Sequence, residues 1–290
     1  MQHAQSIAID TFILKEVCSQ MNIDEIIQQY QDGTSLAQLQ RELGMSVTKI
    51  KQLLISNNIR IRSAKEQTVF TNMNRRKKVN DDIFDALTKE NIWLVGFIAA
   101  DGTIRPTRNE IKISLSSKDR EILEKIRSLL KVEREILDYE TTNGFNVSQL
   151  SFSSFKIKKQ LNDFGIASNK TYLPMSMKFI PENFKINFIH GYFDGDGSIS
   201  TSKNKNDSSI KIVSYNSTIL EEIRIFLQQS YNIRATNIYT DKRRNSLYSL
   251  EYSTIPSLKL LELFYNSNEA SSIFLQRKFN KFQEVLNKRI

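Results

Sequence analysis

The chain has 290 residues with 40% apolar content, which suits one large domain or two to three small ones and excludes disorder as the default reading. Lys and Arg number 41 against 32 Asp and Glu, giving a formal net charge of +9. This excess favours a polyanionic partner such as nucleic acid, although a solvated basic surface without a partner has the same composition.

Residues 1–62 have the pattern of a small helical unit. Three short segments between residues 23 and 56 have helical periodicity, and Gly33 and Gly44 separate them. Thr34, Ser35 and Ser46 are the candidate N-caps. The apolar positions expected to face inward are Ile23, Ile26, Ile27, Tyr30, Leu36, Leu39, Leu43, Val47, Ile50, Leu53 and Leu54.

The third of these helices has a polar open face. Its members are Thr48, Lys49, Lys51 and Gln52. The run resembles a helix-turn-helix, whose last helix enters the major groove, where Lys or Gln reaches base edges or phosphates. A plain three-helix packing unit is the alternative reading.

We predict a basic linker over residues 63–84. The segment has little apolar periodicity and contains a row of four cations, Arg75, Arg76, Lys77 and Lys78. Such a charge run is usually only solvated, but between two DNA-contacting parts it can follow the phosphate backbone.

The chain from residue 85 contains an internal repeat. Leu94-Val-Gly-Phe-Ile-Ala-Ala-Asp-Gly102 matches Ile189-His-Gly-Tyr-Phe-Asp-Gly-Asp-Gly197 in its apolar, glycine and aspartate positions. Later segments repeat too, for example Leu150-Ser-Phe-Ser153 and Leu250-Glu-Tyr-Ser253. We therefore predict two units, 85–182 and 183–290.

Each unit predicts an α+β fold, with an apolar helix, two strands, an amphipathic helix, two more strands and a helix. Strand 111–116 turns its isoleucines to one face and Lys112 and Ser114 to the other, which can meet DNA. Lys211 is the second-copy counterpart of Lys112. Cations near predicted strand ends or turns are candidates for phosphate contact: Arg105, Arg108, Lys242, Arg243 and Arg244.

Asp101 and Asp196 end the two matching helices. Small residues four apart, Gly96 with Ala100 and Gly191 with Gly195, allow two helix backbones to approach closely, so the two acids would meet at one end. Adjoining carboxylates repel each other unless a cation lies between them, which calls for a divalent metal such as Mg²⁺. A single Asp-Gly is a weak signal because it is a common turn pair, and the duplication is what carries the prediction.

Two scarce residue types narrow the chemistry. Cys18 is the only cysteine, which excludes an intramolecular disulfide and a cysteine-based zinc site and fits a reducing compartment. His3 and His190 are too few for a His-ligated metal or a Ser-His-Asp triad, so metal chemistry has to rest on carboxylates. With no apolar run of membrane length, we expect no membrane partner and a cytoplasmic location in a bacterial or phage-infected cell, an organelle being the alternative.

The repeated motifs, LVGFIAADG and IHGYFDGDG, resemble the motif of the LAGLIDADG homing endonuclease family, with departures at Ala99 and His190. The resemblance covers residues 85–290 and implies a pseudo-twofold pair of αββαββα units, whose antiparallel sheets form a saddle over the major groove of double-stranded DNA. It implies that both strands are cleaved across the minor groove. The catalytic acids of the family fall on Asp101 and Asp196.

The resemblance also implies a ligand set. The family's metal, Mg²⁺ or another divalent cation such as Mn²⁺, takes the carbonyl before each acid as well, here Ala100 and Gly195. Many members place a basic residue near the water network, and Lys170 and Lys278 are the nearest equivalents, solvated surface lysines being the alternative. No small-molecule cofactor is implied.

The sequence thus favours a monomeric, site-specific endonuclease that serves intron or gene homing. A binding protein of the same fold, either a non-cleaving DNA-binding regulator or an RNA maturase, is the alternative. Asp194 stands two residues before Asp196, and a helix advances about 100° per residue, so both cannot face the same metal site.

Overall fold

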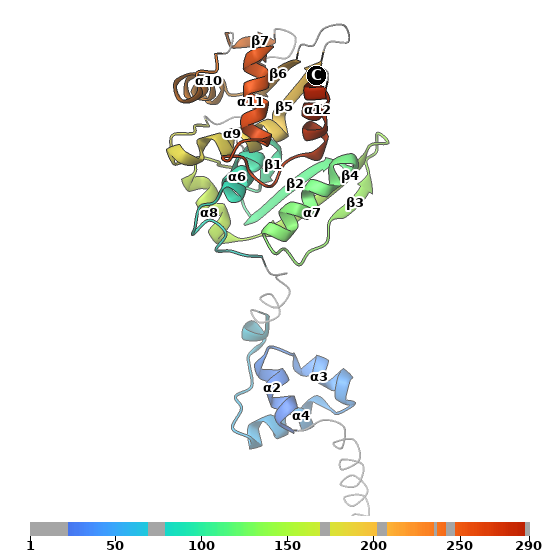
Figure 1. Ribbon diagram of the computed structural model, residues 1–290. Helices are drawn as coiled ribbons and strands as arrows, with labels where there is room; N and C mark the ends of the chain where they lie inside the picture. Colours follow the sequence, from blue (N-terminus) through green and yellow to red (C-terminus); the bar gives the residue numbers. More distant parts are fainter. Residues whose placement is uncertain are drawn as a thin grey trace, which may run out of the picture. The chain divides into compact units, whose positions relative to one another are not determined.

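The structure is a computed structural model that describes residues 23–68, 79–168, 175–201, 208–234, 237–241 and 247–287. The chain divides into two compact units, Met1–Arg76 and Lys77–Ile290 (Figure 1), and each has its own hydrophobic core. Among the described residues, none of the helices combines the length and apolarity that crossing a membrane requires.

The described part of the N-terminal unit contains the helices α2 (Ile23–Gln31), α3 (Leu36–Leu43) and α4 (Val47–Ser56). Ser35 and Gln38 form a reciprocal capping box that begins α3, and the Ser46 side chain accepts a hydrogen bond from Lys49 N to begin α4. Gly44, with φ of 65°, ends α3 in the left-handed region. The three predicted helices are confirmed.

The core of this unit consists of Ile26, Tyr30, Leu39, Ile50 and Leu54. All five are positions that the periodicity turns inward. Ile23 is an exception, because it begins α2 at the edge of this small core and 44% of it is exposed. The inward orientation predicted for Ile23 is therefore wrong.

The described structure shortens the segment predicted as a linker at both ends. Ser63 begins another helical turn over 64–68, where Ser63 N donates to Glu66 Oε2 at 2.7 Å and Glu66 N donates to Ser63 Oγ at 3.2 Å. Gln67 Nε2 donates to the carbonyl of Gly33 at 3.0 Å, which ties this turn to the helical unit. Phe84, near the other end of the predicted linker, is buried in the core of the larger unit. Polar capping between Ser63 and Glu66 orders the turn at 64–68, and capping of this kind leaves no apolar periodicity in the sequence of that turn.

The larger unit contains two copies of one αββαββα arrangement, as the sequence repeat predicts. The first copy consists of α6 (Lys89–Asp101), β1 (Gly102–Ile104), β2 (Glu110–Ser116), α7 (Arg120–Leu129), β3 (Leu137–Glu140), β4 (Asn146–Ser153) and α8 (Phe155–Asp163). The second consists of α9 (Lys185–Asp196), β5 (Gly197–Thr201), β6 (Ser208–Ser214), α10 (Ser217–Tyr231), β7 (Tyr239–Asp241), β8 (Leu247–Ser253) and α11 (Ile255–Tyr265), after which α12 (Gln276–Asn287) follows. Short 3-10 turns, η1 (Ser117–Asp119) and η2 (Glu182–Phe184), precede α7 and α9.

Each copy has one four-stranded antiparallel sheet. The strand orders are β1-β2-β4-β3 and β5-β6-β8-β7, so the two sheets have the same topology. In the first sheet the side chains of Ile111, Ile113 and Leu150 are buried on the side where α7 packs. In the second sheet Ile210, Ile212 and Leu250 are buried on the side of α10 and α11. We call the opposite side of each sheet its open face.

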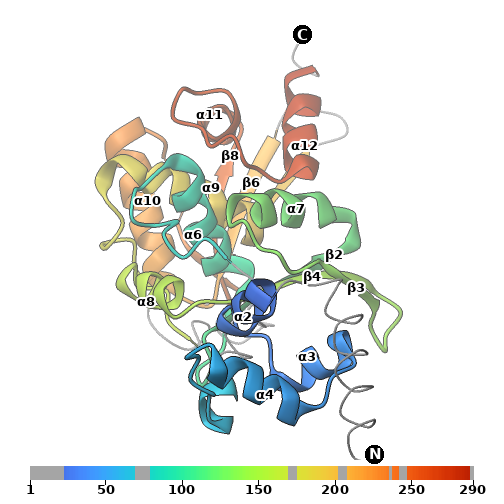
Figure 2. The ribbon, with the colours of Figure 1, turned by 90° about the horizontal axis from the view of Figure 1, so that it is seen from below.

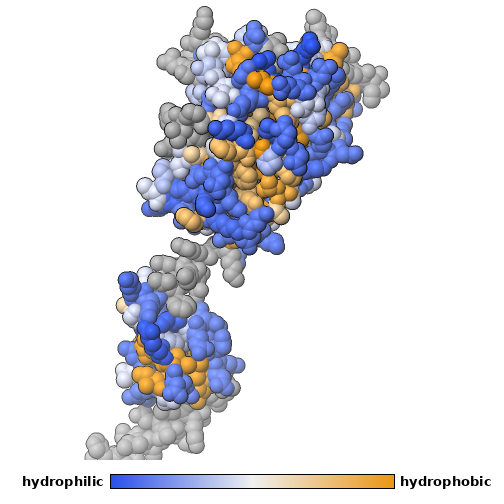
Figure 3. Space-filling view, turned by 90° about the vertical axis from the view of Figure 1, so that its left-hand side faces the viewer, coloured by the Kyte–Doolittle hydropathy of each residue, from blue (hydrophilic) through white to orange (hydrophobic). Residues whose placement is uncertain are grey.

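The surface of the larger unit is mixed in character. Hydrophilic side chains cover most of the face that Figure 3 shows, and an apolar area lies among them. Among the described residues, Phe145 and Phe155 are the most exposed of the large apolar side chains, each at 69%. An uneven surface of this kind is normal for a folded protein, because polar atoms alone cannot cover it.

Candidate active site

The two motif helices, α6 and α9, lie side by side within the larger unit (Figures 1 and 2). Thr88 begins α6 by a capping box with Asn91. Residues 91–99 of α6 and 186–194 of α9 are all buried, which is typical of helices surrounded by protein on every side. The two repeats are therefore joined through a buried helix pair.

The backbones of these helices touch at Gly96 and Gly191. A Cβ atom added to Gly96 would overlap the carbonyl of Phe188 in α9, and one added to Gly191 would overlap the carbonyl of Trp93 in α6. No side chain larger than hydrogen fits at either position. The close approach predicted from the small residues four apart is confirmed at these two glycines.

The crossing brings the C-terminal ends of the two helices together. The last residue of α6 is Asp101, and the last residue of α9 is Asp196. A Cβ atom on Gly195 would lie 3.3 Å from Asp101 Oδ2 and would overlap the Ala100 side chain. The carboxylate of Asp101 thus lies against the residue that precedes Asp196, and both acids are half-buried.

A small cavity of about 50 Å³ borders Asp196, with Ala99, Ala100, Tyr192 and Ser214 among its lining residues. Tyr192 donates a hydrogen bond to Ser214 Oγ at 3.0 Å. Burial, together with the negative charge of Asp196, raises the pKa of the Tyr192 hydroxyl, so it stays protonated and able to donate. Sequence reasoning missed Tyr192, although the signal was present, because the first motif has Phe97 at this position.

Lys278 lies at the same end of α9. Its side chain is 1% exposed, and its Nζ donates to the carbonyls of Asp194, at 2.8 Å, and of Phe193. Burial lowers the pKa of Lys278 to about 8, and the charges of Asp194, Asp101 and Asp196 oppose that shift. The lysine therefore places a positive charge at the negative end of the helix dipole, beside the two acids.

Asp194 is a buried connector. Its carboxylate accepts hydrogen bonds from Trp93 Nε1 at 3.1 Å, from the Tyr265 hydroxyl at 3.2 Å and from Leu275 N at 3.0 Å. These donors belong to α6, to α11 and to the segment before α12. Asp194 thus joins both repeats, and its oxygens point at these donors.

His190 occupies the buried layer next to Asp194. Its ring stacks on Phe264 with centroids 4.8 Å apart, and its Nε2 lies 3.4 Å from Asp194 Oδ2. Burial lowers the pKa of His190 to about 4, against the effect of Asp194, so the ring is neutral at physiological pH. His190 is thus a neutral, buried ring within an aromatic layer formed with Phe264 and Tyr265.

The donors at the helix ends fit a hard cation. The described residues contain no group of three or more His, Cys, Asp and Glu side chains that could hold a metal. Two carboxylates and the adjoining carbonyls of Ala100 and Gly195 are oxygen ligands, the type that Mg²⁺ prefers, and Mg²⁺ usually keeps several waters in its remaining positions. The set does not resemble a structural zinc or calcium site, which would supply more protein ligands.

The open face of the first sheet carries several of the predicted DNA contacts. Lys112 and Ser114 lie on it, and Ser114 Oγ donates to Gln149 Oε1 at 3.3 Å. Arg105 and Arg108 are exposed in the turn between β1 and β2, as predicted. Sequence reasoning missed Arg134, whose Nη1 donates to Ser151 Oγ at 2.6 Å, because it stands in a loop without periodicity.

The remaining predicted contacts divide into two groups. Lys211 lies on the open face of the second sheet, and the four polar residues of α4 are exposed in the N-terminal unit. The others fall outside the described residues: Arg75, Arg76, Lys77, Lys78, Lys242, Arg243 and Arg244. Lys170, predicted as the basic residue of the first copy's catalytic site, also lies outside them.

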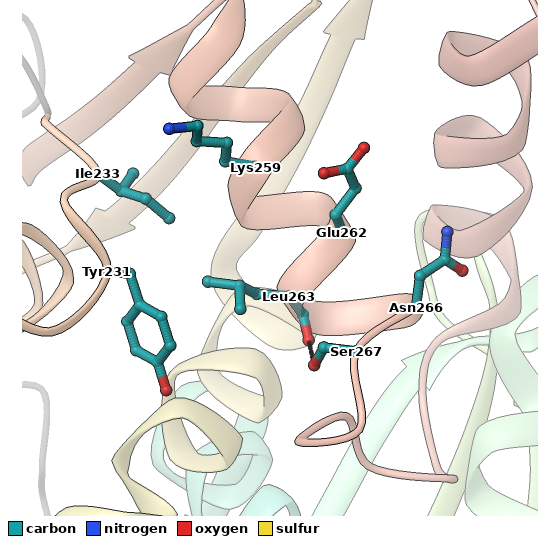
Figure 4. A pocket seen from close by; sticks show the side chains of 7 residues that line it. All are labelled: Tyr231, Ile233, Lys259, Glu262, Leu263, Asn266 and Ser267. Carbon is teal, nitrogen blue, oxygen red and sulfur yellow. Dashed lines mark hydrogen bonds between the residues drawn. The ribbon is translucent and has the colours of Figure 1, made fainter.

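A larger hollow of about 500 Å³ is unrelated to these acids. Tyr231 and Ile233 line it at the end of α10, and Lys259, Glu262 and Leu263 line it from α11 (Figure 4). Ser267 Oγ donates to the carbonyl of Leu263 at 2.7 Å. The hollow offers no paired carboxylates and no other arrangement typical of catalysis, so the helix ends are the candidate active site.

The sequence and this geometry agree with a known family. The chain belongs to the family described as LAGLIDADG-like domain, which matches residues 88–162 and 183–268, more than half of the chain. The two matched segments correspond to the two αββαββα copies.

Individual proteins resemble parts of the chain. The DNA-directed RNA polymerase subunit Rpo1C of Methanocaldococcus jannaschii is 28% identical over 143 residues, which are 49% of this chain and 16% of that protein. The crystal structure of full-length WhiA from Thermatoga maritima has a TM-score of 0.44 at 19% identity, covering 73% of this chain and 65% of that one. The homing endonuclease I-WcaI, bound to its DNA recognition sequence, has a TM-score of 0.47 at 16% identity, covering 70% and 90%. The chain thus spans less than two thirds of both Rpo1C and WhiA.

Proposed function

We propose that this protein is a divalent-metal-dependent endonuclease that cuts double-stranded DNA at specific sites. The observation that carries the proposal is the contact of the Asp101 carboxylate with Gly195, which brings the final acids of two repeated motifs to one end of a helix pair. Each repeat supplies one acid, and a duplex has two strands to cut. A helix pair held together only for stability has no need of matched carboxylates at its end.

Asp101, Asp196 and the carbonyls of Ala100 and Gly195 would hold Mg²⁺ or Mn²⁺. When bound, such an ion supplies Lewis-acid stabilisation of the charge that develops on the attacked phosphate. Lys278 offsets the negative charge that two carboxylates and a helix C-terminus concentrate in this place. Tyr192, kept protonated by burial, holds Ser214 beside Asp196.

Substrate binding would use the open faces of the two sheets. They carry Lys112, Ser114 and Lys211 among polar side chains that can reach base edges in the major groove. Arg134, from the loop before β3, donates to Ser151 on the first of these faces. With two repeats in one chain, a single molecule would cover both halves of a target, so we expect a monomer. The biological use of such site-specific cleavage would be intron or gene homing.

The test uses the DNA that flanks this protein's own gene, with the two flanks joined as they are in a genome without the gene. The full chain, incubated with this duplex and Mg²⁺ or Mn²⁺, should produce discrete fragments, and EDTA should prevent their formation. Binding without cleavage in both metals would instead identify a non-cleaving regulator of the same fold. Absence of binding would refute a DNA-directed function for this site.

A further inference from the structure

The open face of the second sheet carries an ion pair in its centre. Lys211 on β6 and Glu251 on β8 are direct cross-strand partners, and Lys211 Nζ lies 2.6 Å from Glu251 Oε1. Their side chains are 49% and 34% exposed. They border a hollow of about 380 Å³ whose lining also includes Tyr239 and Ser249.

Stability alone does not explain this pair. Exposed ion pairs contribute little to the free energy of unfolding. A carboxylate on a face that meets DNA also repels phosphates and weakens non-specific binding. Glu251 therefore weakens the DNA binding proposed for this face unless its carboxylate accepts a hydrogen bond from a base.

The repeat provides an internal comparison. Lys112 in the first sheet corresponds to Lys211, and its cross-strand partner is Ser151, where the second sheet has Glu251. Ser151 accepts a hydrogen bond from Arg134 at 2.6 Å. In the first sheet the ion-pair partner of Lys112 is Glu110 on the same strand, at 3.7 Å, and the cross-strand position has a hydroxyl. In the second sheet the carboxylate lies directly across from the lysine.

We propose that Lys211 and Glu251 together read one G·C base pair in the half of the target that the second repeat covers. In the major groove, guanine presents two adjacent acceptors, N7 and O6, and its cytosine partner presents the N4 amino donor next to them. A lysine ammonium matches the two acceptors, and the neighbouring carboxylate matches the amino group. The first sheet has Ser151 and not a carboxylate at the corresponding position. We therefore expect the G·C preference only in the half of the target that the second repeat covers.

The same pair fits an A·T pair less well. Adenine and thymine present an acceptor, a donor and then another acceptor. Because the donor separates the two acceptors, one ammonium can bond only one of them while the carboxylate accepts from the adenine amino group, so the pair makes fewer hydrogen bonds than with G·C. The order of the groups therefore selects G·C.

This inference rests on the proposed DNA binding, and the experiment separates the two. The full chain, made inactive with Asp196→Asn, is used to select duplexes from a randomised library, and the selected sequences are counted at each position. The parent should show one G·C preference that Glu251→Ser, which copies the first sheet, reduces about tenfold at that position alone. Glu251→Gln should shift the same position toward A·T, since an amide pairs with adenine.

Glu110→Gln is the matched control. Glu110 lies on the first sheet with its Oε1 3.7 Å from Lys112 Nζ, so its loss should leave the Glu251-dependent position unchanged. A parent that selects no duplex would refute DNA binding itself, before any variant is compared. Selection by the parent, with unchanged base preferences in folded Glu251→Ser and Glu251→Gln, would overturn the reading of G·C by this pair.

Discussion

Asp194 and Asp196 stand two residues apart in one motif but have different surroundings. Asp194 is buried and accepts hydrogen bonds from Trp93, Tyr265 and Leu275. Asp196 ends the helix beside Asp101 and the small cavity. The first motif has Ala99 where the second has Asp194, so a two-acid site needs Asp101 and Asp196 but not a third carboxylate.

We therefore expect Asp101→Asn and Asp196→Asn each to abolish cleavage and to keep DNA binding, because each removes a metal-binding charge with little change in shape. Asp194→Asn should keep most cleavage and lower the free energy of unfolding by about 1–3 kcal/mol, since a neutral amide accepts its hydrogen bonds more weakly. Cleavage, binding and chemical denaturation of the three variants test this assignment. A folded, DNA-bound Asp194→Asn without activity would contradict it.

His190 should make folding stability depend on pH. Burial lowers the pKa of its ring from 6.5 to about 4 in the folded chain. Between these values the unfolded chain binds a proton that the folded chain does not, so stability falls as pH falls through this window, by about 3 kcal/mol in total. His190→Phe, which can keep the stack on Phe264, should flatten the decline between pH 6.5 and 4. Equal pH dependence of the two unfolding free energies would show that His190 is not its source.

At the scale of elements, the helix pair α6 and α9 depends on its two glycines. Gly96→Ala and Gly191→Ala would each force a methyl group into a backbone carbonyl of the partner helix. Because backbone cannot move aside like a flexible side chain, we expect a loss of more than about 3 kcal/mol, or no folding. Gly144→Ala is the control, since nothing closer than 3.8 Å meets its Cβ and only its φ of 79° is strained, at about 1 kcal/mol. Equal denaturation midpoints for all three variants would contradict the proposed crossing.

The duplicated helix and strand patterns were predictable because they are local. Period 3.6 in the motif helices and period 2 in residues 111–116 reflect which side each residue turns to the core, and the repeat doubles the signal. Lys278 was expected near the site only through the family resemblance, because nothing in its own sequence neighbourhood shows that α12 returns to the end of α9. Tyr192 was missed because its counterpart in the first motif is Phe97, so the position is typical of a core aromatic residue in both copies. The sequence does not show that the Tyr192 hydroxyl donates to Ser214.

At the scale of the whole molecule, both candidate acids come from one chain. A second copy is not needed to complete the paired site, so we expect a monomer of 33.7 kDa alone and a single copy on DNA. Sedimentation equilibrium of the free protein and of its DNA complex measures both masses. An obligate dimer would mean that one chain does not cover both halves of the target.

The N-terminal unit should contribute affinity without taking part in the chemistry. Its α4 exposes Lys49 and Lys51, whereas Asp101 and Asp196 both belong to the larger unit. Removal of residues 1–68, which include α2, α3, α4 and the Ser63 turn, should therefore weaken DNA binding and leave cleavage at low salt intact.

Salt dependence shows whether those lysines contact phosphates. Each neutralised phosphate contributes about 0.9 to the slope of log affinity against log salt, so Lys49→Gln with Lys51→Gln in the full chain should reduce that slope by nearly two. Lys159→Gln, a change at an exposed lysine on α8, is the control for loss of charge elsewhere and should leave the slope almost unchanged. Affinity and slope are measured by titration of labelled duplex at several salt concentrations. If the truncated chain and the double variant bind with the same affinity and slope as the full chain, the helical unit is a packing module for this target and not a DNA reader.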